Sequence, residues 1–326
     1  TYNNNYIMEL QDFINDTDNY IKAFKDSKMN VKKYSQLDLL LVKTYSNQTY
    51  DYEKNPWMKY CRGVIINMKT DRVICIPPLK SKQEKEINID DYDESYSFEP
   101  LVDGTMINVF FHNDKWFIST RSNIGAKNSW DGKVPFYKLF TEVNHGDQWL
   151  EGLKKDHCYS FTLQHKKNRI VSPILENKLY LIEMYDLSNG GILKVDTEKL
   201  DVIDGIMNNF LILRSDIGCY LNMDNSYSVK GFTIKRGTER IKWINPNYEY
   251  VNNLKRNFNN KFLSYIELRQ QWKLSEYLKY FPEERHIYNL YRDRYSQIKN
   301  ELYESYIAVH ITKSKGFSKV NYVLKP

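Results

Sequence analysis

The chain has 326 residues, of which 41% are hydrophobic, 15% aromatic and 27% charged. Its 27 Tyr, 15 Phe and 6 Trp exclude an intrinsically disordered protein, and the length suits one or two domains with a sizeable core. With 47 Lys and Arg against 41 Asp and Glu, the net charge is +6, which suits a polyanionic partner and equally a slightly basic solvated surface.

The first 54 residues are expected to be partly helical, because apolar side chains recur at helical spacing around residues 10–14 and 20–24. From Trp57 onward, β-branched and aromatic runs bounded by turn residues predict strands at CRGVIINM, RVICIPP, TMINVFFH, KWFIST, CYSFTL, RIVSPI, KLYLIEMYDL and KGFTIK. Asn113 and Asp114 predict a hairpin turn between two of these runs. Repeated hairpins imply a largely antiparallel sheet, with helices near residues 135–141 and 198–210.

After about Asn245 the pattern changes to helical periodicity, and Pro282 suits the first turn of a helix. We therefore predict an α+β protein with a sheet domain over residues 1–246 and a helical C-terminal domain over residues 247–326.

Other features of the composition concern the cellular compartment. No apolar run approaches the ~20 residues of a membrane span, and the first residues do not form a signal peptide. The four cysteines, Cys61, Cys75, Cys158 and Cys219, include no CxxC pair and are interpreted as reduced, buried thiols. We expect a soluble, cytoplasmic protein without membrane association. Abundant Asn, Lys, Tyr and Ile are typical of an AT-rich genome, such as that of a large DNA virus or a parasite.

Six segments carry the functional information, in the order YCRGVII, EPLVDGTMINVFF, FISTRSNIG, YSFTLQHKKNRIV, VKGFTIK and RIKWINPNYEYV. None is diagnostic alone, because Asp103-Gly104 is a common turn and Arg62-Gly63 is commoner still. Their order and context resemble the motifs of phage-type RNA ligases, members of the covalent nucleotidyltransferase superfamily that includes DNA ligases and mRNA capping enzymes. The resemblance spans roughly residues 40–310 and implies an antiparallel-sheet nucleotidyltransferase (ATP-grasp-like ligase) domain followed by a helical domain.

The resemblance also implies a chemistry. Members of this family join RNA ends by adenylating a lysine with ATP, moving AMP to an RNA 5′ phosphate, and displacing it with a 3′ hydroxyl. These steps need an amine of lowered pKa and divalent metal ions held by carboxylates.

The sequence departs from the family at those groups. Leu101 stands where the motif lysine is expected, and Thr162 and Lys230 stand where two glutamates are expected. One lysine and two glutamates are thus replaced by a single cation, so the site gains two positive charges. We therefore predict no catalytic residue, no metal site and no cofactor.

The positions that still match the family line its nucleotide and phosphate pocket. They are Arg62, Asp103, Gly104, Arg121, Lys235 and Lys242. Together with Lys230 they form the predicted phosphate-binding set. One hypothesis is that Lys230 replaces the metal ion electrostatically, and the alternative is that it points to solvent or pairs with an acid.

The preferred interpretation is a catalytically inactive RNA-ligase-like module, a pseudoenzyme that binds a nucleotide or an RNA 5′ end, including an mRNA 5′ end that is capped. It would act as a subunit of an RNA-processing or translation assembly, with protein partners on the helical domain. Two alternatives stay open. One is an active ATP-dependent RNA ligase or nucleotidyltransferase that uses another lysine, such as Lys230. The other is a protein-interaction scaffold with a vestigial pocket.

Overall fold

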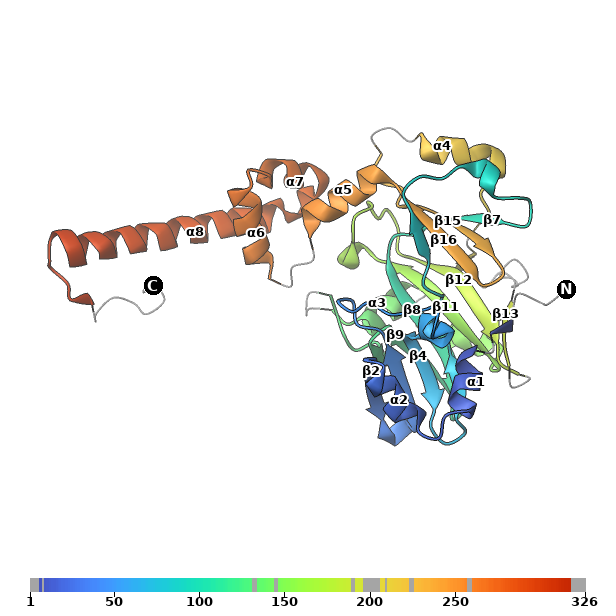
Figure 1. The fold of residues 1–326 in the computed structure, drawn as a ribbon. Helices are drawn as coiled ribbons and strands as arrows, with labels where there is room; N and C mark the ends of the chain where they lie inside the picture. Colours follow the sequence, from blue (N-terminus) through green and yellow to red (C-terminus); the bar gives the residue numbers. More distant parts are fainter. Residues whose placement is uncertain are drawn as a thin grey trace. The chain divides into compact units, whose positions relative to one another are not determined.

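The computed structural model describes residues 6–7, 9–130, 134–143, 146–188, 191–195, 206–208, 210–222, 226–256 and 260–317. Contacts group the chain into two compact units, Thr1–Tyr250 and Val251–Pro326, which are described separately. The expected boundary near residue 246 falls within helix α5 (Pro246–Lys255) and stays a prediction. Sheets dominate the first unit and helices the second (Figure 1), so the predicted α+β class with a helical C-terminal region is confirmed.

The largest sheet has the strand order β1-β13-β12-β11-β8-β9-β10, with β14 paired to β12. Every neighbouring pair is antiparallel except β12 with β14. The strands are β1 (Tyr6–Ile7), β8 (Thr105–His112), β9 (Lys115–Thr120), β10 (Asn123–Ile124), β11 (His157–Gln164), β12 (Lys178–Asp186), β13 (Ile192–Val195) and β14 (Ile206–Asn208). Asn113 and Asp114 have φ angles of 46° and 56°, which confirms the predicted hairpin between β8 and β9.

Two four-stranded sheets complete the first unit, in the orders β6-β16-β15-β7 and β2-β3-β4-β5. The first contains β6 (Lys82–Glu84), β7 (Ser97–Pro100), β15 (Gly231–Arg236) and β16 (Glu239–Ile244). The second contains β2 (Asn30–Tyr34), β3 (Leu39–Lys43), β4 (Arg62–Asn67) and β5 (Arg72–Cys75).

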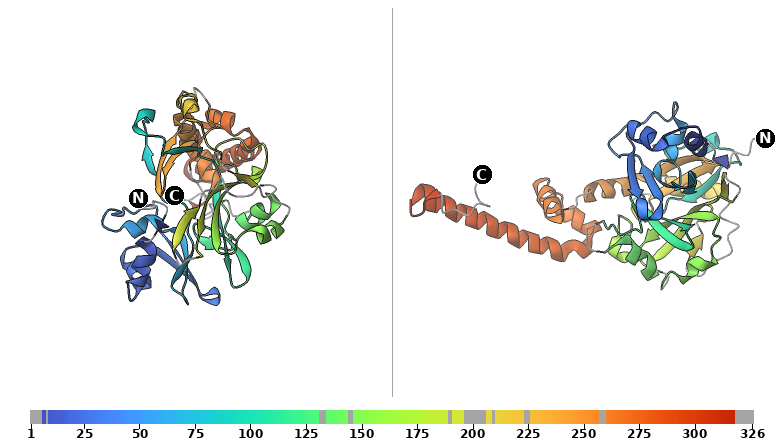
Figure 2. Two further views of the ribbon diagram at one scale, coloured as in Figure 1. Left: turned by 90° about the vertical axis from the view of Figure 1, so that its right-hand side faces the viewer. Right: turned by 90° about the horizontal axis from the view of Figure 1, so that it is seen from below.

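The helices of the first unit are α1 (Glu9–Asn15), α2 (Tyr20–Asp26), α3 (Phe136–Val143) and α4 (Ile217–Leu221). Figure 2 shows α1 and α2 (dark blue) on a different part of this unit from α3 (green). Beyond α5, the second unit contains α6 (Lys261–Gln270), α7 (Leu274–Tyr280) and α8 (Arg285–Tyr306), with Pro282 in the short turn before α8. The helical periodicity after Asn245 is thus confirmed.

The alternation of side chains along β8 and β11 decides where polar groups face. Ile107 and Val109 of β8 and Phe161 of β11 belong to the core cluster that includes α3. Because successive residues of a strand point to opposite faces, Asn108 of β8 and Ser160 of β11 lie on the other face. The largest sheet therefore presents a polar strip on the face opposite α3.

Three expectations are wrong. The run RIVSPI is not a strand, for a reason given below. In the expected helix over residues 198–210, residues 206–208 form β14, whereas residues 198–205 lie outside the described part. Cys61, Cys75 and Cys158 are buried, but Cys219 is exposed because Ile217 occupies the buried face of the short helix α4.

A separate finding concerns membranes. Across the described ranges, the helices are too short or too polar to cross a lipid bilayer.

Candidate functional site

Residues from all three sheets of the first unit line a cavity of about 330 Å³. Its size lies within the range of small-molecule sites, roughly 300–1,000 Å³. Part of the lining is apolar and comes from residues 77–79, 100–102, Met106, Ile182 and Ile244. The other part is basic. An apolar portion beside a cationic portion suits a ligand that has both a flat ring and charged groups.

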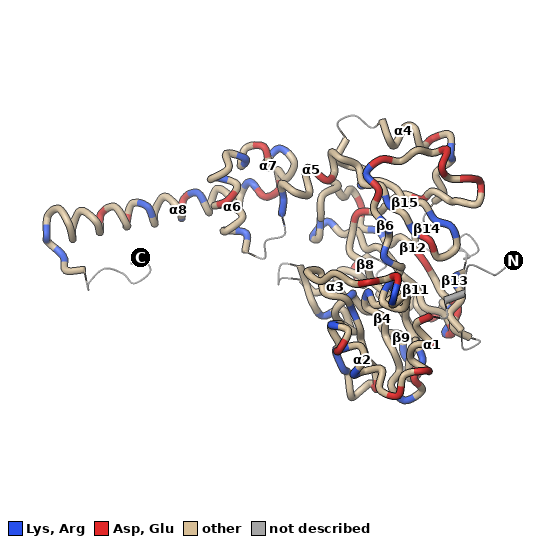
Figure 3. Tube along the Cα trace, viewed as in Figure 1, with Lys and Arg blue, Asp and Glu red and all other residues tan. Residues whose placement is uncertain are grey.

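The charged lining is strongly unbalanced. Six of its side chains are basic, and Glu99 is the carboxylate among them. The basic residues are Arg62, Lys80, Arg121, Lys230, Arg240 and Lys242. Along the trace of both units, Lys and Arg are interspersed with Asp and Glu (Figure 3), whereas the charged lining of the cavity is almost entirely basic.

The three positions that depart from the ligase motifs meet in this cavity. Leu101, Thr162 and Lys230 all line it, although they come from the residue after β7, from β11 and from the residue before β15. Arg62, Gly104, Arg121 and Lys242 also line it. Of the predicted set, Asp103 and Lys235 are placed differently, outside the lining of this cavity.

Asp103 is buried and holds a loop. Its carboxylate accepts hydrogen bonds from the backbone N–H groups of Val171 and Ser172, both at 2.9 Å, and from the Tyr248 hydroxyl at 2.5 Å. These bonds explain why the run RIVSPI is not a strand. In a strand, the N–H groups of this run would donate to the carbonyl groups of a neighbouring strand, whereas here two of them donate to the Asp103 side chain.

Both motif glycines allow close packing of backbone. A Cβ atom on Gly104 would lie 2.5 Å from the Leu163 carbonyl oxygen. Gly63 has a φ of +106°, and a Cβ atom there would lie 2.8 Å from the Arg121 backbone. A larger residue at position 63 would push Arg121 away from β4, and one at position 104 would push the chain before β8 away from β11.

The Lys230 side chain forms an ion pair and is still partly exposed to solvent. Its ammonium lies 3.4 Å from the Asp103 carboxylate and 5.7 Å from the ring centroid of Tyr248, and 23% of its side chain is exposed. It therefore lines the cavity and pairs with an acid at the same time.

The pKa values show that these cations are crowded. Burial and then the neighbouring Arg121 lower the pKa of Arg62 to about 10. Burial, followed by repulsion from Lys230 and Arg62, lowers the pKa of Lys242. Burial also lowers the pKa of Arg121. Since like charges disfavour one another, an anion in this cavity would relieve the repulsion.

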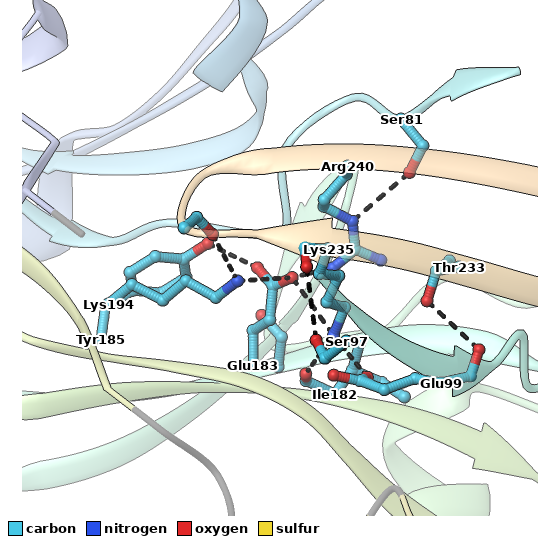
Figure 4. Close-up of polar contacts among 12 residues, drawn as sticks. Ser81, Ser97, Glu99, Ile182, Glu183, Tyr185, Lys194, Thr233, Lys235 and Arg240 are labelled. Atoms are coloured by element: carbon cyan, nitrogen blue, oxygen red, sulfur yellow. Dashed lines mark hydrogen bonds and ion pairs between the residues drawn. The ribbon is translucent and has the colours of Figure 1, made fainter. Parts of the chain in front are cut away.

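Lys235 belongs instead to a buried charge network beside the cavity (Figure 4). Its ammonium lies 2.5 Å from Glu99 and 3.7 Å from Glu183. Glu183 also pairs with Arg240 and with Lys194, the latter at 3.9 Å, and accepts a hydrogen bond from the Tyr185 hydroxyl at 2.5 Å. Burial lowers the pKa of Lys235 and lowers that of Arg240 to about 10.

Sequence reasoning missed this network. Glu183 is an acid inside the apolar run KLYLIEMYDL, and an acid in a buried strand signals a buried ion pair. Glu99, just before the DG motif, carried no comparable signal.

The donor set does not fit a divalent cation. Such an ion needs several free carboxylate or carbonyl oxygens, whereas Glu99 is paired with Lys235 and the remaining charged lining is basic. Among the described residues, the side chains grouped closely enough to hold a metal ion are Asp156, His157 and Asp186, which do not line this cavity.

The comparisons with known proteins agree with the predicted resemblance. No family model matches the sequence. A protein of Autographa californica nuclear polyhedrosis virus that carries the name bifunctional polynucleotide kinase/RNA ligase is 28% identical over 164 residues. This match covers 44% of the present chain and 23% of the viral protein, so the chain corresponds to less than a quarter of that relative.

A solved ligase structure has a similar fold. An archaeal ATP-dependent RNA ligase matches 90% of this chain and 82% of its own, with a TM-score of 0.50 and 13% identity. A Naegleria gruberi RNA ligase mutant with ATP and Mn matches 69% of this chain and 76% of its own, with a TM-score of 0.39 and 12% identity. The chain is RNA-ligase-like, and its nucleotidyltransferase fold is that of the ligases.

Proposed function

We propose that this RNA-ligase-like chain binds a nucleotide or an RNA 5′ end in the basic cavity, without a metal ion and without forming a covalent adenylate. The observation that carries the proposal is the combination of six basic side chains around the cavity with Leu101 in place of the motif lysine. Leucine has no nucleophilic atom, so the cavity retains groups that bind phosphate and lacks the group that the family uses for reaction.

Lys230 and Lys242 supply the charge that a metal ion would otherwise provide. Each charge-assisted hydrogen bond from such a group to a phosphate oxygen is worth about 1.5–3 kcal/mol. Arg62 and Arg121 complete the phosphate-binding set, and Asp103 positions Lys230 at 3.4 Å. Gly104 keeps β8 close to β11, and Lys235 supports the cavity from behind through its pair with Glu99.

The test is a charge reversal measured in the presence of EDTA. Lys230→Glu should weaken the binding of a nucleoside triphosphate or a 5′-triphosphate RNA by about 100-fold or more, because it removes a cation and repels phosphate. It should also make the remaining affinity partly dependent on Mg²⁺. Fluorescence anisotropy or calorimetry, with and without EDTA, checks both effects.

Lys115→Glu is the matched control, because Lys115 is exposed at the start of β9 and does not line the cavity. It changes the net charge by the same amount and should leave the affinity within about twofold. Unchanged affinity of Lys230→Glu, or an equal loss in both variants, would contradict the proposal.

The proposal includes a larger assembly. In the second unit, α8 exposes Leu290, Leu302, Tyr303 and Tyr306, a set of large side chains that suits a protein partner. We infer that this unit attaches the module to an RNA-processing or translation assembly. If the natural protein binds no nucleotide in titrations but retains a stable protein partner in a pull-down, the scaffold hypothesis would be favoured instead.

One observation favours a second candidate, an active nucleotidyltransferase. The Lys230 side chain lines the cavity and is 23% exposed, where its deprotonated amine could attack the α-phosphate of a nucleoside triphosphate, forming a P–N bond and releasing pyrophosphate. Incubation with radiolabelled ATP or GTP and Mg²⁺ separates the two candidates. A label on the protein that survives alkali but is released by hot acid, as expected for a lysine phosphoramidate, and that is lost in Lys230→Arg would establish the enzyme.

A further inference from the structure

We propose that the second unit contains a binding site for single-stranded RNA, in which the Trp272 indole stacks on a base and neighbouring cations contact phosphates. This inference goes beyond the proposed function, because the site lies in the second unit and requires no phosphate at the 5′ end. Two observations carry it, the exposure of Trp272 in an unfavourable backbone conformation and the positive charge of the second unit.

Trp272 lies between α6 and α7, and its exposed fraction is 95%. This is the highest fraction among the large hydrophobic residues that the structure describes. Tryptophan is on average largely buried in folded proteins, because its indole presents a large apolar surface. At this exposure the indole contributes almost no packing to the second unit, so the fold does not explain its presence.

The backbone at Trp272 favours a glycine. The Lys273 N–H donates to the Leu268 carbonyl at 2.9 Å. The Trp272 N–H donates to the Arg269 carbonyl at 3.1 Å. These two bonds end α6 in a Schellman motif, which places one residue in the left-handed region. Trp272 is that residue, with a φ of 59°. Glycine is most common there, since a bulky side chain is strained in this conformation. Trp272 thus opposes the stability of its own turn, which is typical of a residue that acts in binding.

The second unit also carries the positive charge of the chain. Residues 251–326 contain 14 Lys and Arg against 7 Asp and Glu, a net charge of +7. Residues 1–250 contain 33 Lys and Arg against 34 Asp and Glu, a net charge of −1. A strongly basic unit attracts a polyanion, and the phosphate backbone of RNA is one. The charge therefore favours a nucleic-acid partner for this unit.

The surroundings of Trp272 are polar and largely basic. The residues beside it in the chain are Arg269, Gln270, Gln271 and Lys273. Arg256 reaches the same turn and donates to the Gln271 side chain at 2.7 Å, while its ion pair with Glu267 is more than a third exposed on both sides. Proteins bind single-stranded nucleic acid with such an arrangement, in which bases stack on an aromatic ring and cations contact phosphates. A tryptophan that binds another protein is instead usually surrounded by an apolar interface core.

The probe is a 3′-labelled oligouridylate with a 5′ hydroxyl, measured by fluorescence anisotropy in EDTA. Oligouridylate stays single-stranded, and the absence of a 5′ phosphate separates this site from the cavity. Trp272→Ala should weaken binding by about tenfold or more, the loss of one stacked base. Lys273→Gln should reduce the slope of log affinity against log salt concentration by about 0.7, because one phosphate contact is lost.

Further substitutions separate stacking from other roles. Trp272→Phe keeps a flat ring and should bind within about threefold of the natural protein, whereas Trp272→Leu keeps only apolar surface and should bind as weakly as Trp272→Ala. Trp272→Gly should also lose RNA binding, but its midpoint of urea denaturation should equal or exceed that of the natural protein, because glycine removes the strain. Trp130→Leu is the control, since Trp130 is 59% exposed in the first unit, and it should change the affinity by less than about twofold.

The outcomes separate this inference from the proposed function. Lys230→Glu should leave oligouridylate binding within about twofold, and Trp272→Leu should leave triphosphate binding unchanged. Failure of the natural protein to bind any triphosphate would overturn the proposed function and leave this inference intact. Full affinity for oligouridylate in Trp272→Leu, or no binding of oligouridylate by the natural protein, would overturn the inference. A protein partner that is lost in Trp272→Ala, without any RNA binding, would assign this surface to a protein instead.

Discussion

Two charged regions lie side by side in the first unit, and they differ in the ratio of acidic to basic side chains. The network around Glu183 pairs two carboxylates, Glu99 and Glu183, with Lys194, Lys235 and Arg240. The cavity beside it gathers Arg62, Lys80, Lys230 and Lys242. In the described part of the chain, one ion pair involves these four cations, that of Lys230 with Asp103. Arg240 belongs to both regions, since it pairs with Glu183 and also lines the cavity.

The difference in charge balance indicates which region stabilises the fold and which binds a ligand. Removing one partner of a buried ion pair destabilises the fold, because the other charge is left buried and uncompensated. A surplus of charges of one sign instead raises the free energy of the ligand-free protein through repulsion. Groups in the Glu183 network should therefore matter for folding, and groups in the cavity for ligand affinity. The following predictions test this division, from the largest expected effect to the smallest.

Removal of the central carboxylate should have the largest effect. Glu183→Gln keeps the side-chain size but leaves Lys235, Arg240 and Lys194 without their shared partner. The free energy of unfolding should fall by about 3–5 kcal/mol, as measured by urea denaturation, because uncompensated buried charge is strongly destabilising.

Glu239→Gln is the control for this loss. Glu239 pairs with Arg236 at 3.1 Å, but both side chains are more than 40% exposed, so solvent screens the pair. Its removal should cost at most about 1 kcal/mol. Equal effects of the two variants would mean that burial does not distinguish the network.

A neutral substitution in the cavity should show the opposite behaviour. Lys242→Gln removes one of the crowded cations, so the free energy of unfolding should stay the same or rise slightly. Triphosphate affinity should fall about tenfold, the loss of one charge-assisted hydrogen bond. Calorimetry and urea denaturation on the same sample check both, with Lys115→Gln as the exposed control. A large loss of stability would place Lys242 in the structural network.

The pH dependence of binding should reflect the same crowding. The charged form of Lys242 binds phosphate, and its pKa lies below the ordinary 10.5. Affinity for ATP, whose phosphates are fully ionised above about pH 7.5, should therefore begin to fall at a lower pH than an unperturbed lysine would give. Lys242→Arg should move this decline to higher pH. Identical profiles for the natural protein and Lys242→Arg would exclude Lys242 as the titrating group.

Local sequence patterns predict much of the fold. The alternating runs at β8 and β9 have the expected bounds, and helical periodicity identifies α8. The run RIVSPI has strand composition, yet its backbone N–H groups bond to Asp103, which lies 68 and 69 residues earlier in the chain. Composition alone cannot show such a distant acceptor.

The candidate site, too, could be predicted from the sequence only in part. Motif order identified Leu101, Thr162 and Lys230, and the fold brings all three to one cavity. The charge network around Glu183 was not identified, because its partners Lys194, Lys235 and Arg240 come from other strands, and only the fold brings them to this carboxylate.

The smallest expected effect concerns the missing nucleophile. Leu101→Lys restores an amine to the cavity but not the carboxylates that hold metal ions in the ligase family, since Thr162 and Lys230 remain. A further cation should leave triphosphate binding within about threefold or strengthen it slightly, and incubation with radiolabelled ATP and Mg²⁺ should yield no covalent label. Efficient labelling of this variant would show that an amine at position 101 is sufficient for transfer, even though Glu99 and Glu183 are held in ion pairs. Labelling only after Thr162→Glu and Lys230→Glu are added would instead support the view that the cavity exchanged a metal site for fixed positive charge.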